Sequence, residues 1–447
     1  MAQEYEDHLN QRRQERIARR QQQQARQKKL RLQLIIAAVV LVAAAISIVI
    51  IVRSGRDPQT DEVSTQPVTQ ETVDVTEEST EDPEGTETTS ARNPITTIHI
   101  RAAGDLNVTD KVILAGASPM GYDFSACFQD VAGVLSNANL TLLNIEGNFC
   151  GEPYGSVTTS APIQLAQALH AAGVDMVQMA NSCSVNNGVS GLGTTLANLR
   201  SAGLEPVGAY ASSEEFQKSK GYTICEIDGI KVAIVAFTKG VGSRGLPVGS
   251  EDCVNLLYTD FSTTYEEVDT AGIKSILRSA ASEKPDITIA LLHWGSEYND
   301  TISTTQTEIV KLMQNQGVDV IIGTHPHMVH QITYDELTGA LVAYSLGDFF
   351  GDATRSGTAY SIILDLEITK DYDLGTTRVT GYSVIPIYTL SENESADGQR
   401  RVVQIEESML AYKNNFMNRI TASAYESMQY SLARIEARIQ PKETESK

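Results

Sequence analysis

From residue 95 onward, short β-branched and aliphatic runs alternate with stretches that have the spacing of amphipathic helices. Such alternation is typical of an α/β domain, in which helices cover buried sheets. Two later runs, at 358–369 and 376–389, alternate more strictly and predict antiparallel strands, and residues 403–439 predict one or two helices. The expected strands are 95–101, 140–145, 174–179, 222–227, 232–237, 287–292, 318–322 and 341–344, and the expected helices are 124–136, 163–171, 192–201, 265–282 and 304–315.

The start of the chain has a different composition. Residues 1–31 carry nine basic side chains, and residues 32–52 form an uncharged apolar run long enough to cross a bilayer core of roughly 30 Å. The alternative is a cleaved secretory signal, but the basic stretch is long and no A-x-A cleavage site follows the run. The basic excess before the run predicts a cytoplasmic N-terminus and an extracellular remainder.

The predicted membrane span is followed by an acidic spacer. Residues 57–91 hold eleven acidic side chains and no Lys or Arg, which predicts a disordered linker. Residues 93–447 carry a net charge of −18, which argues against a nucleic-acid partner. The expected organisation is a cytoplasmic basic tail (1–31), a transmembrane helix (32–52), a linker (53–92), a folded domain (93–400) and a helical C-terminal extension (401–447).

Histidines gather at the ends of two expected strands, where open α/β sheets place their ligands. His293 ends one strand, and His325 and His327 follow another. Pro326 disfavours a helix at His325, so an extended His-Pro-His segment is expected to point both imidazoles to the same side. Together with nearby carboxylates, these imidazoles form an N/O donor set that suits Zn, Mn or Fe. His330 is expected to be structural.

Five short motifs in a fixed order resemble those of the bacterial capsule-synthesis proteins of the CapA type. That family is associated with poly-gamma-glutamate and in turn resembles the calcineurin-like metallophosphoesterases. The resemblance covers about residues 96–350 and implies a sandwich of two mixed β-sheets flanked by helices, here preceded by the predicted transmembrane helix. The motifs are GD at 104–105, NIE at 144–146, HWGSEY at 293–298, GTHPH at 323–327 and YSLGDF at 344–349.

The resemblance also implies a set of metal ligands in loops at strand ends. The matched positions are Asp105 and Asn107 in the first metal motif, Glu146 in the second as a candidate bridging ligand, His293 in the lone-histidine motif, and His325 and His327 in the final pair. The remaining candidates, which would position ligands or line a substrate pocket, are Asn181, Ser182, Trp294, Glu297, Tyr298 and Asp348. For Trp294, packing beneath the loop is the alternative.

One motif departs from the family pattern. Ser182 stands where the family has a metal-binding Asn, and Cys183 stands where it has a catalytic His. Losing a general acid costs roughly 10²–10⁴-fold in rate, and a thiol replaces it only with a well-tuned pKa. Cys183 is therefore either a weak catalytic group or a small, inert, buried side chain. Among the other cysteines, Cys127 with Cys150 and Cys225 with Cys253 are candidate disulfides.

Two classes of function remain open. The altered motif favours a degenerate CapA-like protein that acts in capsule or poly-gamma-glutamate synthesis, export or surface attachment, with one divalent ion (Mn, Fe or Zn) retained. The alternative is an active metal-dependent phosphoesterase or hydrolase acting on cell-envelope polymer. The expected partners are an anionic cell-envelope polymer or the capsule-synthesis machinery, and membrane lipid through residues 32–52.

Overall fold

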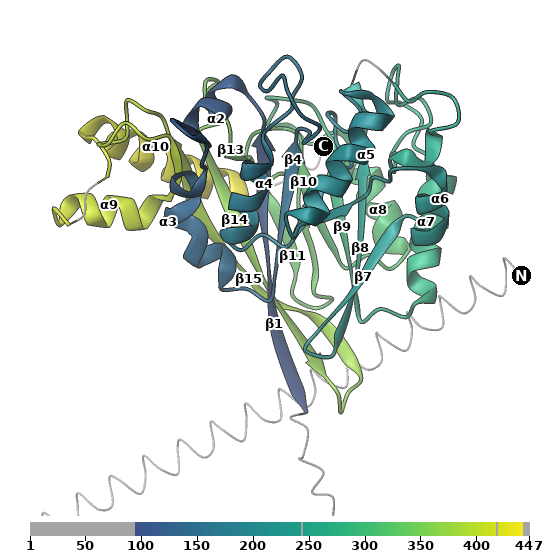
Figure 1. The fold of residues 1–447 in the computed structure, drawn as a ribbon. Helices are drawn as coiled ribbons and strands as arrows, with labels where there is room; N and C mark the ends of the chain where they lie inside the picture. The colour runs from purple at the N-terminus through teal and green to yellow at the C-terminus, as the bar shows by residue number, and fades with distance from the viewer. Residues whose placement is uncertain (1–93, 243–244, 417–418, 441–447) are drawn as a thin grey trace, which may run out of the picture. The chain divides into compact units, whose positions relative to one another are not determined.

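The computed structural model describes residues 94–242, 245–416 and 419–440. These residues form two mixed β-sheets with helices packed against them (Figure 1). The larger sheet has the order β16-β15-β14-β1-β4-β5-β6, and β13 also pairs with β1. Its strands are β1 (Ile95–Asn107), β4 (Leu140–Glu146), β5 (Met176–Gln178), β6 (Glu205–Val207), β13 (Asp348–Phe350), β14 (Tyr360–Asp371), β15 (Thr376–Leu390) and β16 (Arg401–Gln404).

The smaller sheet has the order β11-β12-β10-β9-β8-β7. Its four inner strands run parallel, and each edge strand pairs antiparallel with its neighbour. Parallel strands have both faces covered, which explains why these runs are almost continuously apolar. The strands are β7 (Tyr222–Ile227), β8 (Ile230–Thr238), β9 (Ile287–His293), β10 (Val320–Thr324), β11 (Ile332–Asp335) and β12 (Ala340–Ala343).

Several helices begin where a side chain caps their first turn. Ser303 caps α8 and forms a reciprocal capping box with Gln306, while Asp269 caps α7 and Thr421 caps α10. The helices are α2 (Asp110–Ala115), α3 (Ser125–Ser136), α4 (Ile163–Ala171), α5 (Gly188–Ser201), α6 (Ser213–Ser219), α7 (Thr270–Ser282), α8 (Thr304–Asn315), α9 (Ile405–Lys413) and α10 (Ala422–Ile439). A short hairpin joins β2 (Ala117–Ser118) to β3 (Gly121–Tyr122), and Glu251–Cys253 forms one 3₁₀ turn.

Two apolar cores hold this arrangement. The larger contains α3, α4 and α5 with both sheets, and the smaller packs α7 and α8 on the outer face of the smaller sheet. The expectation of two mixed sheets flanked by helices is confirmed. Because Val402 and Val403 pair with β15 in the larger sheet, the prediction of helix at 403–404 is wrong and the helices begin at Ile405.

The predicted basic tail, membrane span and linker (1–31, 32–52 and 53–92) lie outside the described residues. Within residues 94–242, 245–416 and 419–440, no helix combines the length and the hydropathy needed to cross a membrane. The expected strands 95–101 and 232–237 are both longer in the structure, and β1 continues to Asn107 through an irregularity in its pairing with β4.

Candidate metal centre

The two sheets place polar side chains from five strand ends in one cluster. β1 and β13 supply carboxylates, β4 supplies a third at its last residue, and β9 and the turn after β10 supply imidazoles. All these groups are buried except Asn107, which is half-buried. The structure therefore brings together every metal ligand that the sequence predicts, plus one carboxylate: Asp105, Asn107, Glu146, His293, His325, His327 and Asp348.

Two Gly-Asp pairs fix the carboxylates on the larger sheet. Asp105 and Asp348 are register partners in the parallel pairing of β1 with β13. The Asp105 N–H donates to Gly347 O at 2.9 Å. A Cβ on Gly104 would lie 1.8 Å from that same carbonyl oxygen, so only glycine permits this approach. The amide of Asn107 donates to Asp348 Oδ1 at 2.9 Å.

The His-Pro-His turn is not extended, contrary to expectation. His325 has φ +93° and His327 has φ +58°, values that non-glycine residues rarely adopt. The turn is held from two sides, because the His325 N–H donates to Asp105 Oδ2 at 3.0 Å and the Tyr298 N–H donates to Pro326 O at 3.0 Å. Backbone strain of this kind gathers at functional sites. Both imidazoles still enter the cluster, with ring centres 6.1 Å apart.

Glu146 occupies the centre of the cluster. Its Oε1 lies 3.9 Å from His293 Nδ1 and 4.0 Å from His327 Nε2, and its Oε2 accepts a hydrogen bond from Ser182 Oγ at 2.7 Å. The rings of His293 and His325 are 4.4 Å apart. One carboxylate thus faces an imidazole at the end of β9 and another in the turn after β10.

Burial sets the protonation of the cluster. It raises the pKa of Asp105 to about 6 and that of Glu146 to about 8. Burial and neighbouring cations lower the pKa of His325 to about 3 and hold that of His293 well below its usual value, so both rings are neutral. His327 is the exception: burial alone would lower its pKa, but Asp348 and the other carboxylates outweigh burial and raise it to about 10.

Three buried ligand atoms have no hydrogen-bond partner among the described residues: Glu146 Oε1, His293 Nε2 and His325 Nδ1. Leaving such atoms unpaired costs about 1–3 kcal/mol each. All three residues belong to one group whose ligand atoms lie within 4.8 Å of one another. Two neutral imidazoles and a carboxylate are what a divalent transition metal requires, so these residues fit one.

A second group consists of Asp105, His327 and Asp348, whose ligand atoms also lie within 4.8 Å of one another. Here the atoms already have partners, because His327 Nδ1 lies 2.8 Å from Asp348 Oδ1 and 3.7 Å from Asp105 Oδ2. A third group joins exposed Glu297 to His325 and His327. The two histidines after β10 are therefore shared between groups.

The residues of the altered motif lie beside the cluster with their polar groups engaged. The side-chain amide of Asn181 donates to Asn144 Oδ1 at 3.1 Å and to Ile145 O at 2.7 Å, while its Oδ1 accepts from the Cys183 N–H at 3.0 Å. Ser182 binds Glu146, as described above. Burial, reinforced by the charge of Glu146, raises the pKa of the Cys183 thiol to about 12. That thiol is therefore neutral at physiological pH, which supports the inert reading.

The two aromatic residues of the loop after His293, Trp294 and Tyr298, differ in position. Trp294 is fully buried, donates from Nε1 to Tyr344 O at 3.0 Å and stacks on the Tyr344 ring, so the packing alternative holds. Tyr298 is 37% exposed and stacks on His327, with ring centres 5.1 Å apart. It therefore links an imidazole of the cluster to the surface.

Sequence reasoning missed several supporting residues. Asn144 donates to Asp105 Oδ1 at 2.6 Å, and its position two residues before Glu146, on the same strand face, could have revealed it. Thr324 Oγ1 donates to Gln178 Oε1 at 3.5 Å and so accepts from His293 Nδ1 at 3.3 Å. That tautomer leaves a lone pair on His293 Nε2 for a metal.

Lys239 and Arg355 were also missed. Lys239, just past the end of β8, donates to Gly295 O at 2.6 Å and holds the loop after His293. Its place at a strand end is a usable signal. Arg355 lies in the loop between β13 and β14, with its guanidinium 4.0 Å from the Tyr298 ring centre. No sequence pattern marks it.

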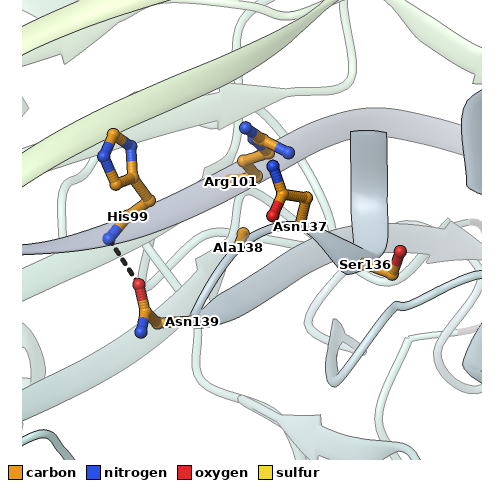
Figure 2. Close-up of a pocket in the computed structure, with 6 residues that line it drawn as sticks. All are labelled: His99, Arg101, Ser136, Asn137, Ala138 and Asn139. Carbon is orange, nitrogen blue, oxygen red and sulfur yellow. Dashed lines mark hydrogen bonds between the residues drawn. The ribbon is translucent and has the colours of Figure 1, made fainter. Parts of the chain in front are cut away.

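A separate hollow of about 370 Å³ lies along an earlier part of β1 (Figure 2). It is lined by His99, Arg101 and residues 136–139. Both side chains contact Asp365, each at 3.0 Å, so their polar groups are already engaged. The hollow offers no group of ligands comparable to the cluster.

All five cysteines are free thiols in the described part of the chain. Neither candidate disulfide, Cys127 with Cys150 or Cys225 with Cys253, is formed there. Burial raises the pKa of Cys127 to about 12 and that of Cys225 to about 11. These thiols are unreactive at neutral pH.

Comparison with known proteins agrees with this picture. Residues 99–353 match the sequence profile of the family described as bacterial capsule synthesis protein PGA_cap. The chain is 28% identical over 212 residues to the PGA biosynthesis protein CapA of Bacillus subtilis, covering 47% of this chain and 50% of that protein. It is 24% identical over 243 residues to the capsule biosynthesis protein CapA of Bacillus anthracis, covering 54% and 53%. The chain thus spans about half the length of these relatives.

Solved structures resemble the chain only distantly. The calcineurin-like phosphoesterase YfkN from Bacillus subtilis is 14% identical with a TM-score of 0.39, and the match covers 77% of this chain and 98% of that one. A phosphatase from Mycoplasma pneumoniae is 13% identical with a TM-score of 0.38, and the match covers 66% and 94%. Likeness at this level carries no argument about activity.

Proposed function

The chain belongs to the bacterial capsule synthesis protein family, and we propose that it acts outside the cell, anchored by residues 32–52, in capsule or poly-gamma-glutamate synthesis, export or surface attachment. The observation that carries the proposal is the buried cluster with three unpartnered ligand atoms, which lies within the residues that match the family. The names of the CapA relatives support the association with a capsule polymer. The predicted membrane span supports the location.

We infer that the group of Glu146, His293 and His325 holds one divalent metal, Mn, Fe or Zn. Its unpartnered atoms make it a better host than the second group, in which His327 and Asp348 are already bonded to each other. A bound metal supplies Lewis acidity toward an oxyanion. The chain's own part is to present neutral imidazoles and to keep the ion from bulk water.

Rapid hydrolysis is not expected. Cys183 replaces the family's catalytic His, and a thiol with a pKa of about 12 is a poor general acid at neutral pH. Ser182 hydrogen-bonds Glu146, and its single hydroxyl replaces the amide of the family's metal-binding Asn. The proposed role is therefore to bind and orient an anionic polymer, with little cleavage of it.

The alternative is an active metal-dependent phosphoesterase acting on cell-envelope polymer. The observation in its favour is that all six matched ligand positions lie in one cluster, with Asp348 as an additional carboxylate. Turnover of a generic phosphate diester by the metal-loaded full chain separates the two functions. Measurable turnover that is lost in Glu146→Gln would favour the enzyme.

The metal site can be tested on the full chain purified in detergent. After reconstitution with Mn, Fe or Zn and removal of free ion, we expect the wild type to retain about one equivalent of metal. His325→Ala should retain far less, because it removes an atom with no other partner. His99→Ala is the matched control, since His99 lies in an earlier part of β1, outside the cluster, and pairs with Asp365 of β14. Equal metal content in wild type and His325→Ala would refute the metal site.

The cellular role requires a separate experiment in the organism that encodes the chain. Deletion of the gene should reduce surface polymer, and the wild-type gene should restore it. Glu146→Gln should restore much less, because Glu146 is the central carboxylate of the cluster. Full restoration by that variant would show that polymer assembly does not use this site.

A further inference from the structure

Arg355 occupies an unusual position beside the proposed metal site. Its guanidinium carbon lies 4.0 Å from the centre of the Tyr298 ring, and that ring stacks on His327 at 5.1 Å with an interplanar angle of 25°. The three side chains form a stack that runs from the metal cluster to the surface. The guanidinium is therefore one tyrosine ring away from an imidazole of the second metal group.

Arg355 also lacks the carboxylate partner that is usual in so acidic a protein. No ion pair within 4.0 Å is formed by Arg355 with residues 94–242, 245–416 or 419–440. By contrast, the buried Arg101, Arg400 and Arg401 all pair with Asp or Glu. An exposed guanidinium held by cation–π contact keeps its N–H donors free for another oxyanion.

Hydrogen bonds hold the loop that presents Arg355 on both sides of that residue. The fully buried Arg400 donates from Nη1 to Gly351 O and to Asp352 O, both at 3.1 Å, and its other nitrogens bind the Glu392 carboxylate at 2.9 and 3.0 Å. On the other side, Thr358 donates from its N–H and Oγ1 to Arg355 O at 3.2 and 2.9 Å. The backbone on both sides of Arg355 is thus fixed by hydrogen bonds.

We propose that Arg355, held on Tyr298, is a recognition subsite for a phosphoryl or carboxylate group of the polymer that the metal site binds. This inference rests on the proposed function and names the chemical class of its ligand. A planar guanidinium binds either oxyanion through two parallel hydrogen bonds. It also supplies a local positive charge, which a domain of net charge −18 needs in order to hold a polyanion.

The test measures binding of two probes to the full chain in detergent: inorganic phosphate and a short poly-gamma-glutamate oligomer. Arg355→Gln should weaken binding of the recognised probe about 10- to 100-fold, the range for a lost charge-assisted pair. Arg355→Lys should weaken binding less than Arg355→Gln, because lysine keeps the positive charge but cannot form two parallel hydrogen bonds. Arg378→Gln is the matched control, since Arg378 is a surface arginine that donates to Glu336 O. Its affinity should equal that of the wild type.

The two probes distinguish the two kinds of oxyanion. If Arg355→Gln loses affinity for phosphate alone, the subsite binds a phosphoryl group, and if it loses affinity for the oligomer, the subsite binds a carboxylate. Equal affinities of Arg355→Gln and wild type for both probes would overturn the subsite, as would failure of the wild type to bind either. Binding is measured with and without metal. A chain that takes up no metal would therefore refute the proposed metal site, while the Arg355 comparison still decides the subsite.

Discussion

Gly104→Ala tests whether the close approach of β1 and β13 is needed for both the fold and the cluster. The new Cβ would lie 1.8 Å from Gly347 O and 2.8 Å from Gly347 C, and these are backbone atoms that no rotamer change can move away. The strands must separate, which breaks the hydrogen bond from the Asp105 N–H to Gly347 O. Overpacking of about 1–3 kcal/mol and a lost hydrogen bond of about 1 kcal/mol together predict a destabilisation of about 3 kcal/mol.

The assay is urea unfolding of the full chain, followed by fluorescence of Trp294. This is the only tryptophan in the sequence, and it is fully buried. At a slope of about 3 kcal/mol per molar urea, the midpoint should fall by about 1 M. Metal retention should fall as well, because Asp105 accepts the hydrogen bond from the His325 N–H, and a shift of β1 would move that ligand.

Gly133→Ala is the matched control for this substitution. Gly133 lies inside α3, and a Cβ there would meet no heavy atom within 4 Å. Alanine in a helix interior should stabilise the chain by about 0.5–1 kcal/mol. If Gly104→Ala unfolds at the same urea concentration as the wild type, the argument from close approach is wrong.

Three further predictions concern the cluster. Glu146→Gln should weaken metal affinity at least about 10-fold in a competition titration, because Oε1 faces two imidazoles; unchanged affinity would exclude it as a ligand. The double change Ser182→Asn with Cys183→His should raise phosphodiesterase turnover about 100-fold or more, by restoring a general acid; no gain would contradict the account of degeneracy. Apparent metal affinity should fall as the pH is lowered from 8 to 6, since protons compete for Glu146, whose pKa is raised to about 8. Affinity that stays constant over that range would show that Glu146 does not bind the ion.

The elements that the sequence predicted best are those with a strong period and a defined start. The bounds of α4 and α8 coincide with the expected 163–171 and 304–315, and α8 begins at a capping box that Ser303 and Gln306 form. The three-residue strands β6 and β13 were missed because they are too short to show a period. The last two residues of β16, Val403 and Gln404, were taken for the start of a helix because so short a stretch fits either pattern.

The cluster was predictable because parallel strands bring their carboxyl ends to one edge. Neighbouring motifs then identified the ligands, but not their backbone conformation. The turn with positive φ values at His325 and His327 is held by a hydrogen bond to Asp105 and another from Tyr298, and both of these residues lie far away in sequence. Arg355 was missed for the same reason, since its role arises from contacts with Tyr298 and no local pattern accompanies it.

The direction of β1 decides which way the cluster faces. The described chain enters the domain at the start of this strand (Figure 1), and by sequence Asp105 lies ten residues after Ile95, near the other end of β1. At about 3.3 Å per residue, entry point and cluster are separated by roughly 33 Å. The ligand-bearing edge of the sheets is therefore remote from the point at which the described chain enters the domain, so a large ligand can reach the cluster without passing the entry strand's first residues.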